Sequence, residues 1–152
     1  KRTSHRVMSI DQPSILVIDD EPSICKGCSL ILREQNYSVS TRTKGRDGLR
    51  EALAGRFDIV LLDMRLPDID GMAILASLRE KKPETQVIVM TGYSTVKNAV
   101  EAMKGGAFDY LAKPFTEDEI ILASGNRRRS ICRSAVCTMR MGCFCPVRGK
   151  PT

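Results

Sequence analysis

The sequence lacks any long apolar run. No stretch approaches the ~20 consecutive apolar residues that a membrane-spanning helix needs, so we expect no membrane segment. Residues 1–13 are basic but contain no apolar core of the ~7–15 residues typical of a secretory signal, and we expect a flexible leader there. These absences make a cytoplasmic protein the default expectation.

Acidic residues are absent from residues 123–152, where seven Lys and Arg residues lie. The chain has 24 basic and 18 acidic residues, which leaves 17 basic against 18 acidic ones in residues 1–122. The net charge of +6 therefore belongs to the C-terminal stretch and does not indicate nucleic-acid binding by the main body. We expect residues 123–152 to be a basic tail, either disordered or the product of a truncation or shifted reading frame.

The six cysteines form no recognisable disulfide or zinc pattern. Cys25 and Cys28 have the C-x-x-C spacing of redox proteins, but they lie within a predicted helix, so we expect core packing or surface thiols. The tail cysteines have the spacing C-x₄-C-x₅-C-x-C, which is not one of the common paired zinc spacings. They are Cys132, Cys137, Cys143 and Cys145.

Short apolar runs alternate with helical patterns over residues 14–122, which we expect to form one domain. The predicted strands cover residues 14–20, 37–42, 57–63, 86–90 and 107–112. The predicted helices cover residues 22–36, 46–54, 72–81 and 95–104, with a fifth beginning near residue 116 and ending near 122 or extending to about 136. This alternation predicts an α/β fold, a doubly wound five-stranded parallel sheet with helices on both faces.

Two of these helices have distinctive starts. Ser94 is the predicted N-cap of helix 95–104, whose apolar residues recur at spacings of three and four and predict an amphipathic helix. Thr116 and Glu119 have the spacing of a capping box at the start of the last helix. The apolar residues of helix 95–104 are Val96, Ala99, Val100 and Met103.

Polar side chains stand at the ends of four predicted strands: Asp19 and Asp20, Asp63, Thr91, and Lys113. Taken singly, each has an ordinary explanation, such as acids at a helix start or a lysine on the surface. In an open parallel sheet, however, the carboxyl ends of the strands meet at one edge. Three carboxylates there would repel one another without a cation, and Mg²⁺ prefers such oxygen ligands. A hydroxyl and an ammonium are the donors that a phosphoryl group requires.

This pattern resembles the receiver domain of two-component response regulators over about residues 15–122. The stretch 92–115 is especially similar to receivers of bacterial enhancer-binding activators. The resemblance implies a flavodoxin-like sheet of order 2-1-3-4-5. It rests on Asp19-Asp20, on Asp63 followed by Leu66-Pro67 and Gly71, on Thr91-Gly92, and on Lys113-Pro114 after Tyr110.

The resemblance implies a role for each residue. Asp63 would be the phosphoacceptor, and Lys113 would contact a phosphoryl oxygen. Mg²⁺ would be bound by Asp20, Asp63 and the backbone carbonyl of Arg65, with Asp19 acting through water or by orienting it.

The same resemblance implies a switch and its partners. Thr91 and Tyr110 would respond to the phosphate and change the surface of residues 94–111. The phosphodonor would be a sensor histidine kinase or a small acyl phosphate. The switched surface would control an output domain or a partner, with a transcriptional output. A homodimer could form on the face of the fourth helix, fifth strand and fifth helix. DNA would be contacted only through an output domain that this chain is too short to contain.

Two other functions compete. Phosphatases with an aspartyl intermediate resemble this site, but they usually carry a second acid two residues after the nucleophile, where this chain has Arg65. A nucleic-acid-binding module could use the arginines at 127–129 to contact phosphates. We find no recognition helix or aromatic stacking pattern to support the second function.

Overall fold

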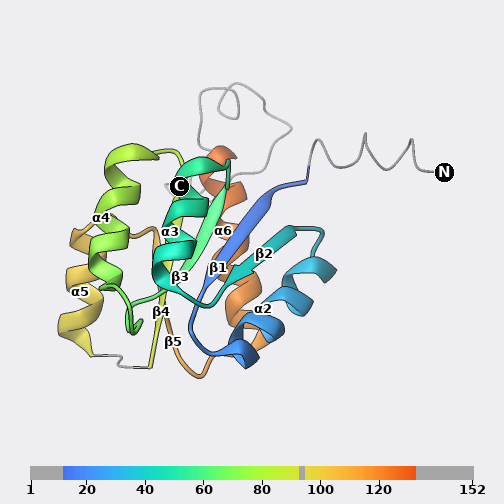
Figure 1. The fold of residues 1–152 in the computed structure, drawn as a ribbon. Helices are drawn as coiled ribbons and strands as arrows, with labels where there is room; N and C mark the ends of the chain where they lie inside the picture. The colour runs from blue at the N-terminus through green and yellow to red at the C-terminus, as the bar shows by residue number, and fades with distance from the viewer. Residues whose placement is uncertain (1–11, 93–94, 133–152) are drawn as a thin grey trace, which may run out of the picture.

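The structure is a computed structural model that describes residues 12–92 and 95–132 (Figure 1). Most of the predicted leader, Ser94 and the tail beyond Cys132 lie outside these ranges. The strands within them are β1 (Ser14–Ile18), β2 (Ser38–Arg42), β3 (Ile59–Asp63), β4 (Gln86–Thr91) and β5 (Asp109–Ala112). The helices within them are α2 (Pro22–Glu34), α3 (Gly45–Ala54), α4 (Gly71–Lys81), α5 (Val96–Lys104) and α6 (Glu117–Cys132). Of the described helices, none combines the length and the apolar character needed to cross a membrane.

The strands form one parallel sheet in the order β2-β1-β3-β4-β5. The predicted α/β fold and the strand order implied by the resemblance are both confirmed. β3 lies at the centre of the sheet, with β1 and β4 as its neighbours. Three of the four site-bearing strands are therefore adjacent, and the fourth, β5, pairs with β4.

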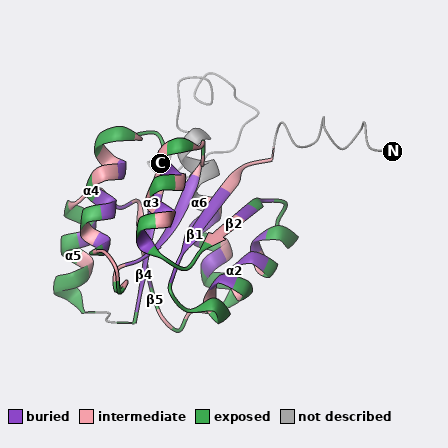
Figure 2. Ribbon diagram, in the orientation of Figure 1, coloured by how far each residue is buried: buried purple, intermediate pink, exposed green. Residues whose placement is uncertain are grey.

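Alternate residues of the inner strands enter two hydrophobic cores. Ile15 and Ile59 lie in the core that α2 and α6 cover, whereas Leu16 and Val60 lie in the core that α3, α4 and α5 cover (Figure 1). The inner strands β1, β3 and β4 are buried on both faces, and the helices expose their outer sides (Figure 2). Burial on both faces explains why these strands are continuous apolar runs rather than alternating ones.

Cys25 and Cys28 are buried in the core beneath α2, and both thiols are free. Burial, the largest cause, and the nearby charge of Asp19 raise the pKa of the Cys28 thiol to about 12. The reactive thiolate is therefore scarce at neutral pH. The expectation of core packing is confirmed for this pair, while the side chains of the tail cysteines lie outside the described residues.

The starts of the last two helices give one correction and one confirmation. Ser94 lies outside the described residues, and the N-cap of α5 is Thr95, whose Oγ1 accepts a hydrogen bond from the Asn98 N–H at 3.1 Å. At α6 the capping box is present: the Thr116 N–H donates to Glu119 Oε1 at 2.9 Å, and the Glu119 N–H donates to Thr116 Oγ1 at 3.1 Å.

The apolar stripe of α5 faces outward. Val96, Val100 and Met103 are 82%, 44% and 46% exposed, while Ala102 makes the buried contact with the core. The periodicity predicted an amphipathic helix, but the face of α5 that packs on the core presents the small side chain of Ala102 rather than the larger apolar side chains. Helix α5 therefore leaves a row of apolar side chains without cover in the described chain.

Arg79, near the end of α4, links three chain segments. Its guanidinium donates hydrogen bonds to the backbone carbonyls of Lys82, Pro83 and Thr85 at 3.1, 2.9 and 2.6 Å, and to that of Gly106 at 3.3 Å. Gly106 has φ +103°, and a Cβ there would lie 2.5 Å from Arg79 Cδ, so the glycine makes room for the arginine. This clamp fixes the start of β4 and the turn before β5, the two strands whose other ends carry Thr91 and Lys113.

Arg79→Met should lower the free energy of unfolding by roughly 1–3 kcal/mol, because partly buried carbonyls lose their donors while the apolar stem is kept. Urea unfolding of the variant measures this change. Lys81→Met, at an exposed position of the same helix, is the matched control and should change little. Equal stabilities of the Arg79 and Lys81 variants would contradict the clamp.

Candidate functional site

Asp63 is the last residue of β3, and it lies at the centre of the sheet edge. Its carboxylate is almost fully buried, and Oδ1 accepts a hydrogen bond from the Arg65 N–H at 3.1 Å. The chain then returns so closely that a Cβ on Gly71 would lie 2.5 Å from the Cα of Met64. Only glycine allows this close approach, which brings the start of α4 against the end of β3.

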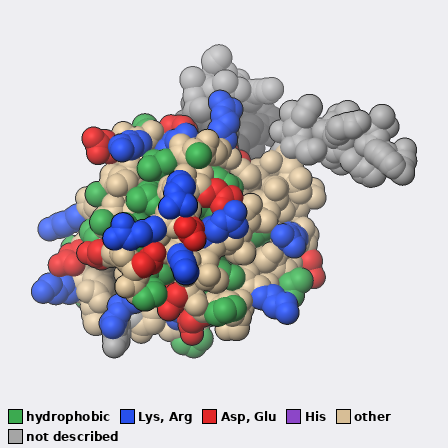
Figure 3. Space-filling model, in the orientation of Figure 1, with side chains coloured by type: hydrophobic (Ala, Val, Ile, Leu, Met, Phe, Trp, Pro, Cys, Tyr) green, Lys and Arg blue, Asp and Glu red, His purple; other side chains and the backbone are tan. Residues whose placement is uncertain are grey.

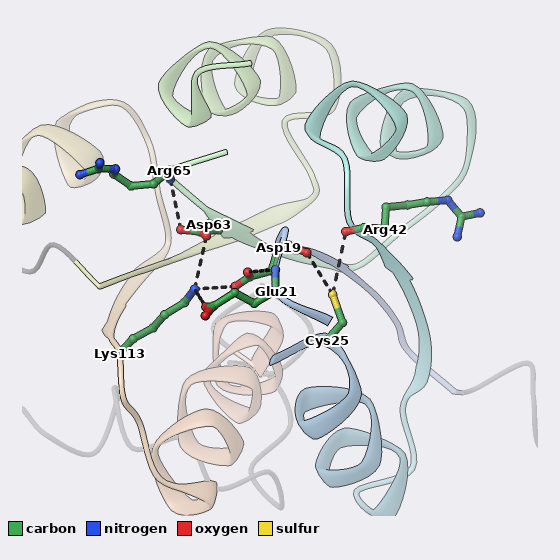
Figure 4. A network of polar contacts seen from close by, with 7 residues as sticks. All are labelled: Asp19, Glu21, Cys25, Arg42, Asp63, Arg65 and Lys113. Atoms are coloured by element: carbon green, nitrogen blue, oxygen red, sulfur yellow. Dashed lines mark hydrogen bonds and ion pairs between the residues drawn. The ribbon is translucent and has the colours of Figure 1, made fainter. Parts of the chain in front are cut away.

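Lys113 joins the site from β5. Its backbone N–H donates to the Thr91 carbonyl at 2.9 Å, which extends the pairing of β4 and β5 and fixes the start of the side chain. Its ammonium nitrogen lies 2.7 Å from Asp19 Oδ2, 3.1 Å from Glu21 Oε1 and 3.3 Å from Asp63 Oδ2 (Figure 4). One cation therefore bridges the ends of β1, β3 and β5.

Asp19 and Asp20 enter the site from the end of β1. Asp19 is fully buried; its N–H donates to the Arg42 carbonyl at 3.1 Å, and its Oδ1 accepts from the Glu21 N–H at 2.9 Å. Asp20 is exposed. Ligand oxygens of Asp19, Asp20 and Asp63 all lie within 4.8 Å of one another. Three clustered carboxylates facing one ammonium carry an excess of negative charge, and a hard divalent cation such as Mg²⁺ fits this donor set.

Burial raises the pKa of Asp63, and the neighbouring charge of Asp19 raises it further. The Arg65 N–H and the Lys113 ammonium lower it and offset only part of that rise. At Lys113, burial alone would lower the pKa, but the hydrogen bond and charge of Asp19, together with Asp63 and Glu21, outweigh it and raise the pKa. Lys113 therefore stays protonated and positively charged. At Asp63, the Arg65 N–H and the Lys113 ammonium do not fully offset burial and the charge of Asp19.

Two hollows lie at this sheet edge. One, of about 380 Å³, opens over the carboxylates and is lined by Asp20, Glu21, Asp63, Arg65, Gly92 and Lys113. The other, of about 270 Å³, lies between the sheet edge and α5. Thr91, Arg65 and Tyr110 are among the residues that line this second hollow. Thr91 is buried and Tyr110 is partly buried, so both predicted switch residues border one space.

The structure thus gathers Asp19, Asp20, Asp63 and Lys113 into a single cluster, and it sets Thr91 directly beside Lys113 in the sheet. The Arg65 side chain points away from Asp63 and Lys113, while its backbone N–H faces Asp63 (Figure 4).

Two residues at this edge were not recognised in the sequence. Glu21 is not among the predicted site residues, although it directly follows Asp20 at the same strand end. The Cys25 thiol donates to the Asp19 carbonyl at 3.3 Å (Figure 4). The position of Glu21 next to Asp20 could have identified it as a site residue, whereas nothing in the sequence indicates that Cys25 contacts Asp19.

Asp63→Asn should stabilise the protein in EDTA at pH 7. Because the pKa of Asp63 is raised in the folded chain, the unfolded chain releases this proton first, and stability is lost as the pH rises above the ordinary aspartate pKa of about 4. The amide removes the repulsion from Asp19 and should raise the midpoint of thermal unfolding by roughly 2–6 °C. The difference should vanish below about pH 4.

Calorimetric scans across this pH range test the prediction, with Asp118→Asn at an exposed position as the control. A destabilised Asp63→Asn protein at pH 7 would mean that the ion pair with Lys113 outweighs burial and repulsion.

Comparison with known proteins identifies the domain. The family model of the response regulator receiver domain matches residues 15–124. Transcriptional regulatory protein ZraR of Escherichia coli strain K12 is 41% identical over 113 residues, which cover 74% of this chain and 26% of ZraR. The chain therefore spans about a quarter of that relative's length.

Solved structures agree with the family match. The solution structure of the beryllofluoride-activated NtrC4 receiver domain dimer is 35% identical, with a TM-score of 0.72, and the match covers 75% of this chain and 94% of that one. A response regulator from Burkholderia pseudomallei, solved with a phosphorylated aspartic acid, a calcium ion and citrate, is 29% identical with a TM-score of 0.70. That match covers 82% of this chain and 74% of the other. The chain belongs to the response regulator receiver domain family.

Proposed function

We propose that this receiver domain is a phosphoacceptor switch and that Asp63 accepts the phosphoryl group. Receiver domains are signalling modules that bind Mg²⁺ at an acidic phosphorylation site and work with sensor kinases. The observation that carries the proposal is the Lys113 ammonium, 3.3 Å from Asp63 and 2.7 Å from Asp19, on the lining of an open hollow that also exposes acidic residues.

The chemistry is a transfer to a carboxylate. An Asp63 oxygen attacks the phosphorus of a phosphohistidine on a sensor histidine kinase, or of a small acyl phosphate. The new bond joins that oxygen to phosphorus, the bond from phosphorus to the donor breaks, and its electron pair leaves with the donor group. Lys113 contacts a phosphoryl oxygen as a point charge, and the protein otherwise contributes positioning.

Asp20, Asp63 and the Arg65 carbonyl would hold Mg²⁺, with Asp19 acting through water or by orienting it. Bound Mg²⁺ neutralises charge on the phosphoryl oxygens. The mutual proximity of the three carboxylates supports this assignment.

The signal would travel through Thr91 and Tyr110. A phosphoryl group on Asp63 adds roughly −1.5 to −2 charge and strong acceptors, to which the Thr91 hydroxyl could move and donate. Tyr110 would then turn into the 270 Å³ hollow that both residues border. The affected surface, residues 94–111, includes the exposed apolar stripe of α5.

That stripe supports a homodimer or partner interface formed by α5, β5 and α6. The NtrC4 receiver, which is a dimer in its beryllofluoride-activated form, is a precedent. ZraR is a transcriptional regulator, and we propose a transcriptional output here, with DNA contacted only by a domain outside this chain. The cytoplasmic location stays a prediction.

The competing functions receive less support. The second acid that a phosphatase needs is replaced by Arg65, whose side chain points away from Asp63 (Figure 4). On the face seen in Figure 3, basic and acidic side chains lie interspersed rather than forming a basic patch. The side chains of the arginines at 127–129 lie outside the described residues.

Incubation with acetyl phosphate and Mg²⁺ should add one phosphoryl group to the full chain, measured by intact mass. Asp63→Asn should abolish the gain, because the amide is not a nucleophile, and EDTA should suppress it. Asp118→Asn is the matched control and should label like the wild type. Labelling that persists in Asp63→Asn would refute Asp63 as the acceptor.

Tyr110→Ala should leave labelling of Asp63 intact but weaken phosphate-dependent association, because the ring is no longer available to fill the hollow. Sedimentation with and without acetyl phosphate measures this effect. Tyr110→Phe keeps the ring and should associate like the wild type. Loss of labelling in Tyr110→Ala would show that Tyr110 supports the phosphorylation site rather than the output.

A further inference from the structure

Glu21 provides a third carboxylate for Lys113. Its Oε1 lies 3.1 Å from the ammonium nitrogen, and its side chain is 57% exposed, whereas those of Asp19 and Asp63 are 0% and 5% exposed (Figure 4). It is one of the residues that line the 380 Å³ hollow. Glu21 is thus the solvent-facing partner of a lysine whose other two partners are buried.

Local structure directs Glu21 toward this pairing. The residue occupies the N-cap position of α2, where its backbone N–H donates to Asp19 Oδ1 at 2.9 Å. Its side chain makes no capping hydrogen bond with the helix. The backbone therefore anchors Asp19, while the carboxylate reaches across to β5.

The donor capacity of Lys113 makes these three partners competitors. An ammonium has three N–H donors, and Asp19, Glu21 and Asp63 each lie within ion-pair distance of them. A phosphoryl oxygen on Asp63 would compete with these carboxylates for the ammonium. Asp19 is buried and would be left uncompensated, at a large free-energy penalty. Glu21 is exposed, and water can replace Lys113 as its partner.

We propose that Glu21 is a positioning residue that holds Lys113 in the unphosphorylated domain and competes with the phosphoryl group for it. The proposal rests on the phosphoacceptor function above. Before transfer, Glu21 holds the ammonium through their 3.1 Å ion pair. When a phosphoryl group occupies the hollow, Lys113 exchanges Glu21 for a phosphoryl oxygen, and the Glu21 carboxylate returns to water.

A role for Glu21 as a metal ligand is less consistent with the structure. The cluster of mutually close ligand oxygens contains Asp19, Asp20 and Asp63, and Glu21 is not a member of it. The Glu21 carboxylate instead accepts a hydrogen bond from the Lys113 ammonium at 3.1 Å. The two roles predict different effects of removing the Glu21 charge. If Glu21 competes for Lys113, its removal strengthens phosphoryl binding. If Glu21 binds the metal, its removal weakens Mg²⁺ binding.

The experiment measures binding of beryllofluoride, a phosphoryl mimic, to the full chain at saturating Mg²⁺ by calorimetry. Glu21→Gln should bind it about two- to fivefold more tightly than the wild type, the range expected for losing one exposed ion pair as a competitor. Glu34→Gln removes the same charge from an exposed position at the far end of α2, about 20 Å away along the helix. This control should bind like the wild type.

A second measurement separates the two roles. Without beryllofluoride, we titrate Mg²⁺ and record the concentration that gives half of the maximal rise in the thermal midpoint. For Glu21→Gln this concentration should stay within about twofold of the wild-type value. Loss of a group that supports a metal typically weakens metal binding tenfold or more. That tenfold loss, unchanged or weaker beryllofluoride binding, or an equal gain in Glu34→Gln would each overturn the role of Glu21. Absence of beryllofluoride binding to the wild type would instead refute the phosphoacceptor function itself.

Discussion

The Lys113 ammonium is the interaction on which this sheet edge depends. Asp19 is fully buried and Asp63 nearly so, and two buried carboxylates so close together would be strongly destabilising without a cation. Lys113 lies within 3.3 Å of both and compensates part of their charge. Burial first, and then the charge of Asp19, raise the pKa of Asp63 by more than Lys113 and the Arg65 N–H lower it. The site therefore keeps an excess of negative charge. A divalent cation would neutralise this charge, and phosphoryl transfer needs such a cation.

The parallel sheet supplies the precision that this arrangement needs. β1, β3, β4 and β5 run side by side, so their carboxyl ends deliver Asp19, Asp63, Thr91 and Lys113 to one edge. Backbone hydrogen bonds then fix the positions, from Asp19 to Arg42 and from Lys113 to Thr91. The close approach at Gly71 brings the start of α4 against Asp63. The charged side chains sit at strand ends, while the exposed apolar stripe lies on α5.

Much of the fold and the cluster could be predicted because they follow from local signals. Apolar runs located the strands, and polar residues directly after them located the edge. The rest depends on contacts between distant segments. The spacing of Val96, Val100 and Met103 reveals an apolar stripe but not what covers it, and the structure leaves it exposed. Adjacent Ser94 and Thr95 are both good caps, so spacing could not choose between them. The roles of Arg79 and Glu21 depend on partners far away in the sequence. Arg79 bonds to Gly106, 27 residues away, and Glu21 to Lys113, 92 residues away.

A crystal structure of the full chain with Mg²⁺ and beryllofluoride tests the central claim most directly. The account predicts the beryllium group on an Asp63 oxygen, Mg²⁺ bound by Asp20, Asp63 and the Arg65 carbonyl, and the Lys113 ammonium on a fluoride. A metal bound elsewhere, or Lys113 still paired with Glu21 and away from the fluoride, would contradict it.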